Sequence, residues 1–296
     1  MNGFVNLLKP AGMTSSDAVL WVKKLLPRKT AVGHGGTLDP DAAGVLPICV
    51  GKATRLFNYI IDKEKTYIGE LCLGITTTTD DASGEILEVK AVNATEDDVK
   101  AVLPRFTGDI LQVPPMFSAL KRDGVALYKL ARKGETIELE SRPVHIESIE
   151  LIGKNGANKY LLKIVCGKGT YIRSLMRDIG EALGCGGHMS FLMRSAAGVF
   201  DCEHAHTIEE LRAAENLEAL LEPMDAPLIR FPEIHVREEF RGKVINGVPL
   251  TREMLGEDMP EGGYIKLYCG NDFAGMGEVT EEGCIKIKCM LLETGT

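Results

Sequence analysis

Strand-like and helix-like segments alternate along residues 1–230, and this alternation restricts the fold more than any other feature of the sequence. Short apolar runs with strand character stand between segments whose apolar residues recur at helical spacing. The strand-like segments are 66–74, 85–89, 142–153, 160–167 and 191–200, and the helix-like segments are 15–26, 95–106, 170–184 and 207–221. Strand-like runs also follow one another in hairpin-like pairs, which favours an α+β domain over a doubly wound parallel sheet.

Local end signals accompany two of these helices. Ser15 or Ser16 is the expected cap of the first helix, and Thr95 with Asp98 has the spacing of a capping box. The polar run TTTTDDASG, residues 76–84, predicts a loop between two strands.

The chain changes character after residue 222. The stretch EPMDAPLIRFPE holds three prolines, and the short strand-like runs that follow it are EIHV, KVINGVPL, GGYIKLYC, AGMGEV and CIKIKCMLL. Five short strands separated by glycine turns are typical of a small β-barrel. We therefore expect one large domain over residues 1–230 and a small barrel over residues 231–296.

Composition narrows the class of protein. The eight cysteines include no Cys-x-x-Cys pair, which favours reduced thiols in the cytoplasm. No apolar run approaches the ~20 residues of a membrane span, and the first residues lack the pattern of a signal peptide. The net charge is −8, yet residues 1–200 hold 25 Lys and Arg against 22 Asp and Glu, whereas residues 201–296 hold 9 against 20. A polyanion would thus meet the first two thirds more easily, although ordinary charge scatter explains the counts equally well.

Residues 33–51, GHGGTLDPDAAGVLPICVG, form a glycine-rich turn followed by an apolar run. A Walker phosphate loop would need a glycine where Leu46 stands and Ser or Thr after Lys52, so that interpretation fails. Pro40 biases Asp39 towards an extended backbone. From these residues alone, Asp39 is either the start of an Asx turn or a mounted reactive carboxylate.

Other candidate residues are individually weak. Tyr67 lies on a predicted strand, where its ring could stack on a base, and Arg173 lies in the first turn of a predicted helix, where it could hold a carboxylate. Cys202, His204 and His206 have the spacing of metal ligands on a strand, but a polar loop explains them better, and we expect no metal.

Seven blocks, in order, resemble the TruB family, the bacterial tRNA pseudouridine synthases that act on the T-loop uridine. The blocks are LLKPAGMTSSDAV, GHGGTLDPDAAGVLPICVGKATR, KTYIGELCLG, PPMFSALKRDGVALYKLARKGE, SRPVHI, KGTYIRSLMRDIGEALGCGGH and FLMRSAAGVF. The resemblance implies a pseudouridine synthase fold, with a central mixed, largely antiparallel sheet flanked by helices, and a small PUA-like barrel at the C-terminus. It departs at Gly35, where the family usually has threonine, which puts the local loop geometry in question.

The resemblance also implies a reaction. The N1–C1′ bond of a uridine would break, and the ring would turn and rejoin through C5, without cofactor or metal. Asp39 would attack C1′ or take a proton from C2′, Tyr67 would stack on the target ring, and Arg173 would pair with Asp39. Leu192 would pack at the pocket.

RNA contacts follow from the same resemblance. His34 would wedge into the T-loop where the base leaves the stack. Lys9 and Pro10 would form a turn that supports the active-site loop. The insertion 113–134 would close over the RNA. Phosphate contacts are expected from its basic side chains, including Lys121 and Arg132, and from Lys168.

Three functional hypotheses remain open at this stage. The first is a stand-alone, monomeric tRNA pseudouridine synthase. The second is an RNA chaperone of the tRNA elbow, which needs the basic insertion and His34 but not Asp39. The third is a guide-RNA-dependent pseudouridine synthase subunit that works with partner proteins; the start of the first family block within ten residues of the N-terminus favours the stand-alone branch.

Overall fold

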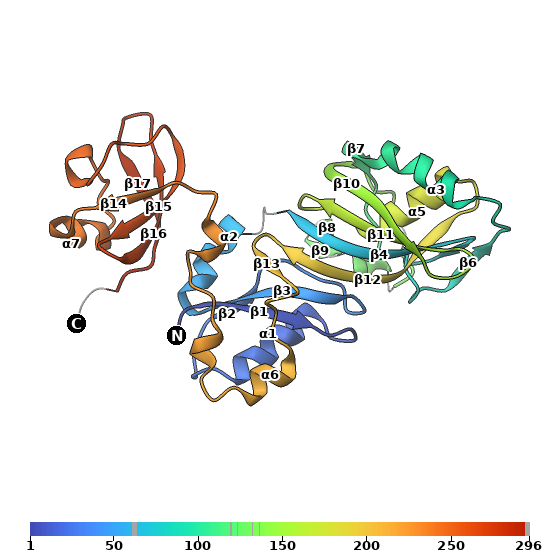
Figure 1. Cartoon of the computed structure of the whole chain (residues 1–296), viewed down its shortest axis with the longest axis horizontal. Coiled ribbons are helices and arrows are strands. Elements are labelled where there is room, and N and C mark those ends of the chain that lie inside the picture. Colours follow the sequence, from blue (N-terminus) through green and yellow to red (C-terminus); the bar gives the residue numbers. More distant parts are fainter. Residues whose placement is uncertain (61–63, 119, 123, 132, 136, 294–296) are drawn as a thin grey trace.

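The computed structural model describes residues 1–60, 64–118, 120–122, 124–131, 133–135 and 137–293. Two sheets of unequal size dominate the elongated molecule, and Figure 1 shows the smaller one at one end. Among the described residues, no helix has the length and apolar character needed to cross a membrane.

The large sheet is mixed and largely antiparallel, as expected. Its main path runs β1 (Gly3–Lys9), β3 (Ala43–Val50), β12 (Gly187–Ala197), β4 (Lys65–Leu73), β11 (Lys159–Cys166), β10 (Arg142–Lys154) and β7 (Gly108–Gln112). Two short strands join it from the side: β2 (Val32–His34) pairs with β3, and β13 (Phe200–Asp201) pairs with β12. The β3–β12 pair is parallel, and the other pairs are antiparallel.

Helix α1 (Ser15–Lys24) begins one residue earlier than its expected caps allow. Its cap is Thr14, whose hydroxyl accepts from the Asp17 backbone N–H in a capping box. Ser15 cannot serve as the cap because its buried hydroxyl bonds to Leu38, far along the chain. The prediction of Ser15 or Ser16 as cap was therefore wrong.

The remaining helices follow the sequence to different degrees. Helix α3 (Glu96–Val102) has the predicted capping box of Thr95 and Asp98, and the 3-10 turn η2 (Leu103–Phe106) continues it. Helix α5 (Ile172–Ala182) packs its apolar face on the large sheet. The helix predicted over 207–221 was too long. The backbone becomes extended at Ala214, so α6 (Ile208–Ala213) is followed by a separate 3-10 turn, η3 (Leu217–Leu220).

The small sheet has four strands, so the prediction of five was wrong. Its order is β14 (Glu233–Val236), β15 (Gly263–Cys269), β16 (Asp272–Val279) and β17 (Ile285–Met290). The run KVINGVPL falls instead in helix α7 (Arg241–Ile245) and the turn after it, where Gly247 has a φ of 70°. Single bridges from Leu250 to Ile285 and from Leu255 to Val236 connect the segment after this turn to both edge strands.

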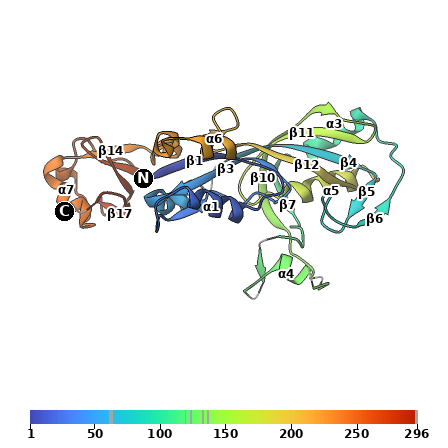
Figure 2. The same cartoon turned by 90° about the horizontal axis from the view of Figure 1, so that it is seen from below.

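Several short strands, helices and 3-10 turns lie outside the two main sheets. The predicted loop at 76–84 begins within β5 (Ile75–Thr77), which pairs with β6 (Ile86–Val89). The insertion contains β8 (Lys121–Arg122), β9 (Val125–Ala126) and α4 (Leu127–Ala131), and Figure 2 shows it projecting away from the large sheet. The remaining short elements are η1 (Gly51–Leu56), α2 (Phe57–Ile60), η4 (Ala226–Leu228), η5 (Glu238–Phe240) and η6 (Arg252–Met254).

One apolar cluster joins the two sheets. It combines buried side chains of the large-sheet region with side chains from the small sheet and the residue after it. Members from the first group include Phe4, Val45 and Leu56, and members from the second are Met276, Cys289 and Leu291. Separate clusters fill the interior of each region.

Candidate active site

Asp39 and Arg173, which lie 134 residues apart, meet in the structure. The Arg173 Nε lies 2.9 Å from one carboxylate oxygen of Asp39, and its Nη2 donates to the other at 3.3 Å. The Arg173 side chain is 7% exposed, whereas that of Asp39 is 36% exposed. A buried guanidinium thus holds the carboxylate from one side by an ion pair through Nε and a hydrogen bond from Nη2, and it leaves another side accessible.

Arg173 also connects Asp39 to two other segments. Its guanidinium donates to the carbonyls of Thr79, at 3.4 Å, and Phe117, at 3.0 Å. The Asp81 carboxylate lies 3.7 Å from its Nε. Because Phe117 belongs to the insertion, the root of the insertion and the Asp39 loop share one arginine.

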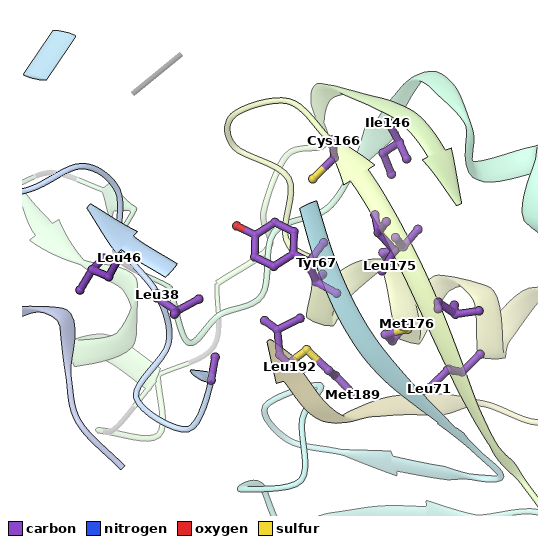
Figure 3. Packing of buried hydrophobic residues seen from close by; sticks show 14 of the residues in the cluster. Leu38, Leu46, Tyr67, Leu71, Ile146, Cys166, Leu175, Met176, Met189 and Leu192 are labelled. Atoms are coloured by element: carbon purple, nitrogen blue, oxygen red, sulfur yellow. The ribbon is translucent and has the colours of Figure 1, made fainter. Parts of the chain in front are cut away.

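Tyr67 lies on β4 and is 8% exposed. In Figure 3 its hydroxyl points towards the side where Leu38 and Leu46 lie, and Leu192 of β12 lies beside its ring. Burial raises the pKa of Tyr67 above its ordinary value, so the phenol is neutral at neutral pH. Tyr67 and Leu192 therefore form an apolar wall that carries one hydroxyl.

Arg194 is a residue that the sequence analysis missed. It is fully buried on β12, and it donates to the carbonyls of Val45 at 2.8 Å, Thr37 at 3.2 Å and Gly36 at 3.3 Å. Arg194 is also the partner of Tyr67 in the antiparallel pairing of β12 with β4, and its charge partly opposes the effect of burial on the pKa of Tyr67. Arg194 consequently links the glycine-rich loop to the tyrosine, and the available signal was a charged residue inside the apolar run FLMRSAAGVF.

The crossing of β3 and β12 requires glycine at position 44. Gly44 has a φ of 116°, and a Cβ there would lie 2.2 Å from the carbonyl oxygen of Arg194. Only glycine permits this approach, which brings the Arg194 backbone against the strand that follows the Asp39 loop.

Ser15 fixes the residue that precedes Asp39. Its hydroxyl donates to the Leu38 carbonyl and accepts from the Leu38 N–H, both at 2.9 Å. Both main-chain polar groups of buried Leu38 are thereby satisfied by a single side chain from α1.

Lys9 fixes the residue that follows Asp39. Its buried ammonium donates to the carbonyls of Met13 at 2.6 Å, Pro10 at 2.8 Å and Pro40 at 3.1 Å. Burial is the main cause that lowers the pKa of Lys9 to about 8. The ammonium binds the protein's own backbone and ties the end of β1 to the Asp39 loop.

Comparison with known proteins agrees with this geometry. The model of the TruB family pseudouridylate synthase N-terminal domain matches residues 23–172, and that of the tRNA pseudouridylate synthase B C-terminal domain matches residues 173–229. A tRNA pseudouridine synthase B of Alkaliphilus oremlandii is 45% identical over 99% of both chains. The protein belongs to the TruB family. A second member, from Stutzerimonas stutzeri, is also 45% identical, over 96% of this chain and 94% of its own.

Solved structures support the same fold. A chain in a Cbf5–Nop10–Gar1 complex superposes with a TM-score of 0.74 at 27% identity, covering 98% of this chain and 84% of its own. A chain in an H/ACA RNP bound to a substrate RNA containing 2′-deoxyuridine gives the same TM-score at 24% identity, covering 98% and 85%, and this shows the fold alone.

Gly35, which departs from the usual TruB pattern, still anchors the glycine-rich loop to β3. The Gly35 N–H donates to the Pro47 carbonyl at 2.7 Å. A Cβ at this position would lie 3.2 Å from Cδ1 of Ile60 and 3.3 Å from Cβ of Pro47. Neighbouring side chains therefore occupy the space next to the glycine, and its amide is bound.

The remaining predicted residues lie at varied positions. His34 is half-buried on β2, and burial followed by the nearby Arg194 charge lowers its pKa. Pro10 is exposed at the end of β1, and Lys168 is exposed in the turn before α5. Lys121 belongs to β8, but its side chain, like all of Arg132, lies outside the described residues.

Cys202, His204 and His206, which have the sequence spacing of metal ligands, lie between β13 and the start of α6. His204 binds the carboxylate of Asp201 through Nδ1 at 2.8 Å, and the Cys202 thiol faces the carbonyl of Arg194 at 3.7 Å. Within the described part of the chain, no three His, Cys, Asp or Glu side chains are grouped as metal ligands.

Proposed function

We propose that this protein isomerises a uridine in the T-loop of tRNA to pseudouridine, with Asp39 as the catalytic carboxylate. The observation that carries the proposal is the ion pair of half-accessible Asp39 with buried Arg173, at a place where the Asp39 charge also acts on the Tyr67 hydroxyl. Names of TruB relatives that match nearly the whole chain supply the substrate class.

The reaction needs the target base outside the stack, because the reacting atoms are inaccessible within a folded loop. The flipped uridine would lie against Tyr67 and Leu192, whose buried faces exclude water. Asp39 would attack C1′ or remove a proton from C2′, and in either route the N1–C1′ bond breaks and the uracil leaves with the bonding electrons. The ring then turns and C5 bonds to C1′; this step breaks the Asp39–C1′ bond in the first route, and in the second route the proton returns from Asp39 to C2′. The C5 proton is then lost while N1 gains one.

Each remaining side chain has a role in this scheme. Arg173 would orient the carboxylate through its ion pair and its Nη2 hydrogen bond. The neutral Tyr67 hydroxyl would stand near the ring and could pass the C5 proton. His34 would fill the space that the base leaves. Lys168, Lys121 and Arg132 would contact phosphates, and Lys9 and Pro10 would hold the loop on which Asp39 stands.

The assembly belongs to the proposal as well. We place the enzyme in the cytoplasm as a monomer with a catalytic region over residues 1–230, an insertion over 113–134 that closes on RNA, and a PUA-like RNA-binding region over 231–296. Full-length relatives named tRNA pseudouridine synthase B favour this stand-alone form over a guide-dependent subunit. The arginine-bound carboxylate favours an enzyme over a chaperone, which needs no such pair.

The decisive experiment compares wild type with Asp39→Asn on a tRNA transcript, mapping pseudouridine by position. We expect conversion at one T-loop uridine by the wild type, none by the Asn variant, and equal RNA binding by both, because Asn keeps the size but removes the charge. Normal turnover by Asp39→Asn would exclude Asp39 as the catalyst. Failure of the purified wild type on a bare T stem-loop would favour the guide-dependent alternative.

A further inference from the structure

A positively charged surface lies away from Asp39. A concave region is lined by Met1, Asn2, Arg28, Lys29, Thr30, Ala31, Gly51, Lys52, Thr54 and Arg55, and we call this set the basic cradle. Four of these side chains are cationic, the terminal ammonium of Met1 adds a fifth positive group, and none of the lining residues is acidic.

The basic cradle and Asp39 lie at opposite ends of the same strands. Gly3 pairs with Val50 at the cradle end of β1 and β3, and Lys9 pairs with Gly44 at the Asp39 end. The seven residue steps from Ala43 to Val50 correspond to roughly 23 Å at the usual rise of a strand. The cradle is therefore a separate surface, too distant for a nucleotide bound at Asp39 to reach.

The turn after α1 presents two of the cations. The Thr30 hydroxyl donates to the Pro27 carbonyl at 2.8 Å, and Lys29 adopts a φ of 74°, which is uncommon for a lysine. Arg28 and Lys29 are both exposed, and among the described residues neither forms an ion pair. Their charges are thus displayed to solvent on a defined turn.

The other two cationic side chains, Lys52 and Arg55, are held by backbone carbonyls at the end of the small sheet. Arg55 Nη1 donates to the Met290 carbonyl at 2.9 Å, and Lys52 Nζ donates to the Leu291 carbonyl at 2.7 Å. Lys52 also pairs with Glu293 at 3.0 Å, while the Met1 ammonium lies 3.7 Å from Glu218. Carbonyl acceptors cancel no charge, so Arg28, Lys29 and Arg55 keep the cradle positive.

The surrounding sequence strengthens this field. Between residues 18 and 61 the only acids are Asp39 and Asp41, whereas the cations include Lys23 and Lys24 in the last turn of α1. Figure 2 shows α1 and the insertion helix α4 on the same side of the large sheet. A polyanion held under the insertion would therefore pass α1 on its way to the basic cradle.

We propose that the basic cradle binds the sugar-phosphate backbone of a double-stranded RNA stem, the stem of the same RNA whose loop occupies the Asp39 site. This inference rests on the proposed function. Exposed cations with no acid among the lining residues suit phosphates and read no bases, so the contact is independent of sequence. The distance from Asp39 exceeds the loop itself, which places the contact on the stem, where the acceptor stem of tRNA stacks on the T stem.

The test uses two RNAs and two double variants. One RNA is the isolated T stem-loop, and the other is the same hairpin lengthened by the acceptor stem. Arg28→Ala/Lys29→Ala removes the free cations, and Lys100→Ala/Arg105→Ala removes two exposed cations near α3, at the other end of the molecule. Binding is measured in the Asp39→Asn background, so that it is independent of turnover, and thermal melting verifies folding.

We expect the cradle variant to weaken binding of the long RNA roughly tenfold and to reduce the slope of log Kd against log salt by about two, while hairpin binding hardly changes. With Asp39 intact, kcat at saturating long RNA should match wild type. Equal losses on both RNAs, no loss on the long RNA, or the same loss in the Lys100/Arg105 control would overturn the inference. Absence of pseudouridine formation by wild type would instead overturn the proposed function.

Discussion

The glycine-rich loop at 35–40 and the insertion at 113–134 are held in opposite ways. Side chains or backbone from β1, α1, β3 and β12 bind the loop at nearly every residue, through Lys9, Ser15, Pro47 and Arg194. The insertion is fixed at its root, where Ser174 and Arg177 bind the Val113 carbonyl. Farther along, the described backbone hydrogen bonds of residues 120–135 join residues within 118–135 to one another.

This difference separates two requirements of one enzyme. A reacting carboxylate must be held within a fraction of an ångström, which demands buried hydrogen bonds from several elements. A segment that closes over a large RNA must move, and segments with few packed contacts can do so at little cost in free energy. Changes in the loop should therefore affect stability and chemistry together, whereas changes in exposed side chains of the insertion beyond its root should affect mainly RNA binding.

The largest effect is expected from Arg194→Met. Methionine fills part of the volume but leaves the carbonyls of Gly36, Thr37 and Val45 without their donor, so the free energy of unfolding should fall by about 3 kcal/mol. Turnover should fall strongly because the loop that carries Asp39 loses its bonds from β12. Urea unfolding and a pseudouridine assay measure both, and Arg105→Met on the exposed surface is the control. Wild-type turnover in Arg194→Met would show that the loop at 35–40 keeps its catalytic conformation without the Arg194 hydrogen bonds.

Lys9 provides a smaller, pH-dependent effect. Its folded pKa of about 8 lies below the ordinary 10.5, so between these values the unfolded chain binds a proton that the folded chain lacks. The contribution of Lys9 to the free energy of unfolding should therefore rise with pH from about 8 to 10.5 and stay constant below pH 8. The difference between wild type and Lys9→Met in urea unfolding isolates this group. A flat difference across that range would contradict the depressed pKa.

The smallest effect on stability is expected in the insertion. Lys129 is exposed on α4, so Lys129→Ala should change the free energy of unfolding by less than about 0.5 kcal/mol. RNA binding should weaken roughly threefold, with a salt slope reduced by about one. Lys100→Ala on α3 is the matched control. A stability loss above about 1 kcal/mol would mean that the insertion is packed rather than free to close.

Sequence signals predicted the features that depend on residues close together in the chain, such as one of the helix caps. The capping box of Thr95 and Asp98 involves residues three apart, and it formed as predicted. The cap of α1 was misplaced because Ser15 bonds to Leu38, 23 residues away. Arg194 was missed for the same reason, since its acceptors lie 149 to 158 residues distant and its own segment has an ordinary strand pattern.

The site shows the same division. The resemblance to the TruB family predicted that Asp39, Tyr67 and Arg173 share one active site. The structure places Asp39 and Arg173 in contact. Their catalytic roles stay predictions until the variants are measured. The resemblance assigned Lys9 to a turn that supports the Asp39 loop, and its ammonium does bind the Pro40 carbonyl. No pattern in the sequence indicated that the Ser15 hydroxyl holds Leu38, because burial and direction arise only when the elements pack.

The apolar cluster that joins the two sheets has a mechanical consequence. Buried side chains of the two regions pack in one apolar cluster, which includes Phe4, Val45, Leu56, Met276, Cys289 and Leu291. The small sheet is therefore packed against the large-sheet region and is not joined to it by a flexible linker alone. A chain cut after residue 230 would bare these side chains to water and tend to aggregate. The distance between Asp39 and the small sheet is accordingly set by this shared interior.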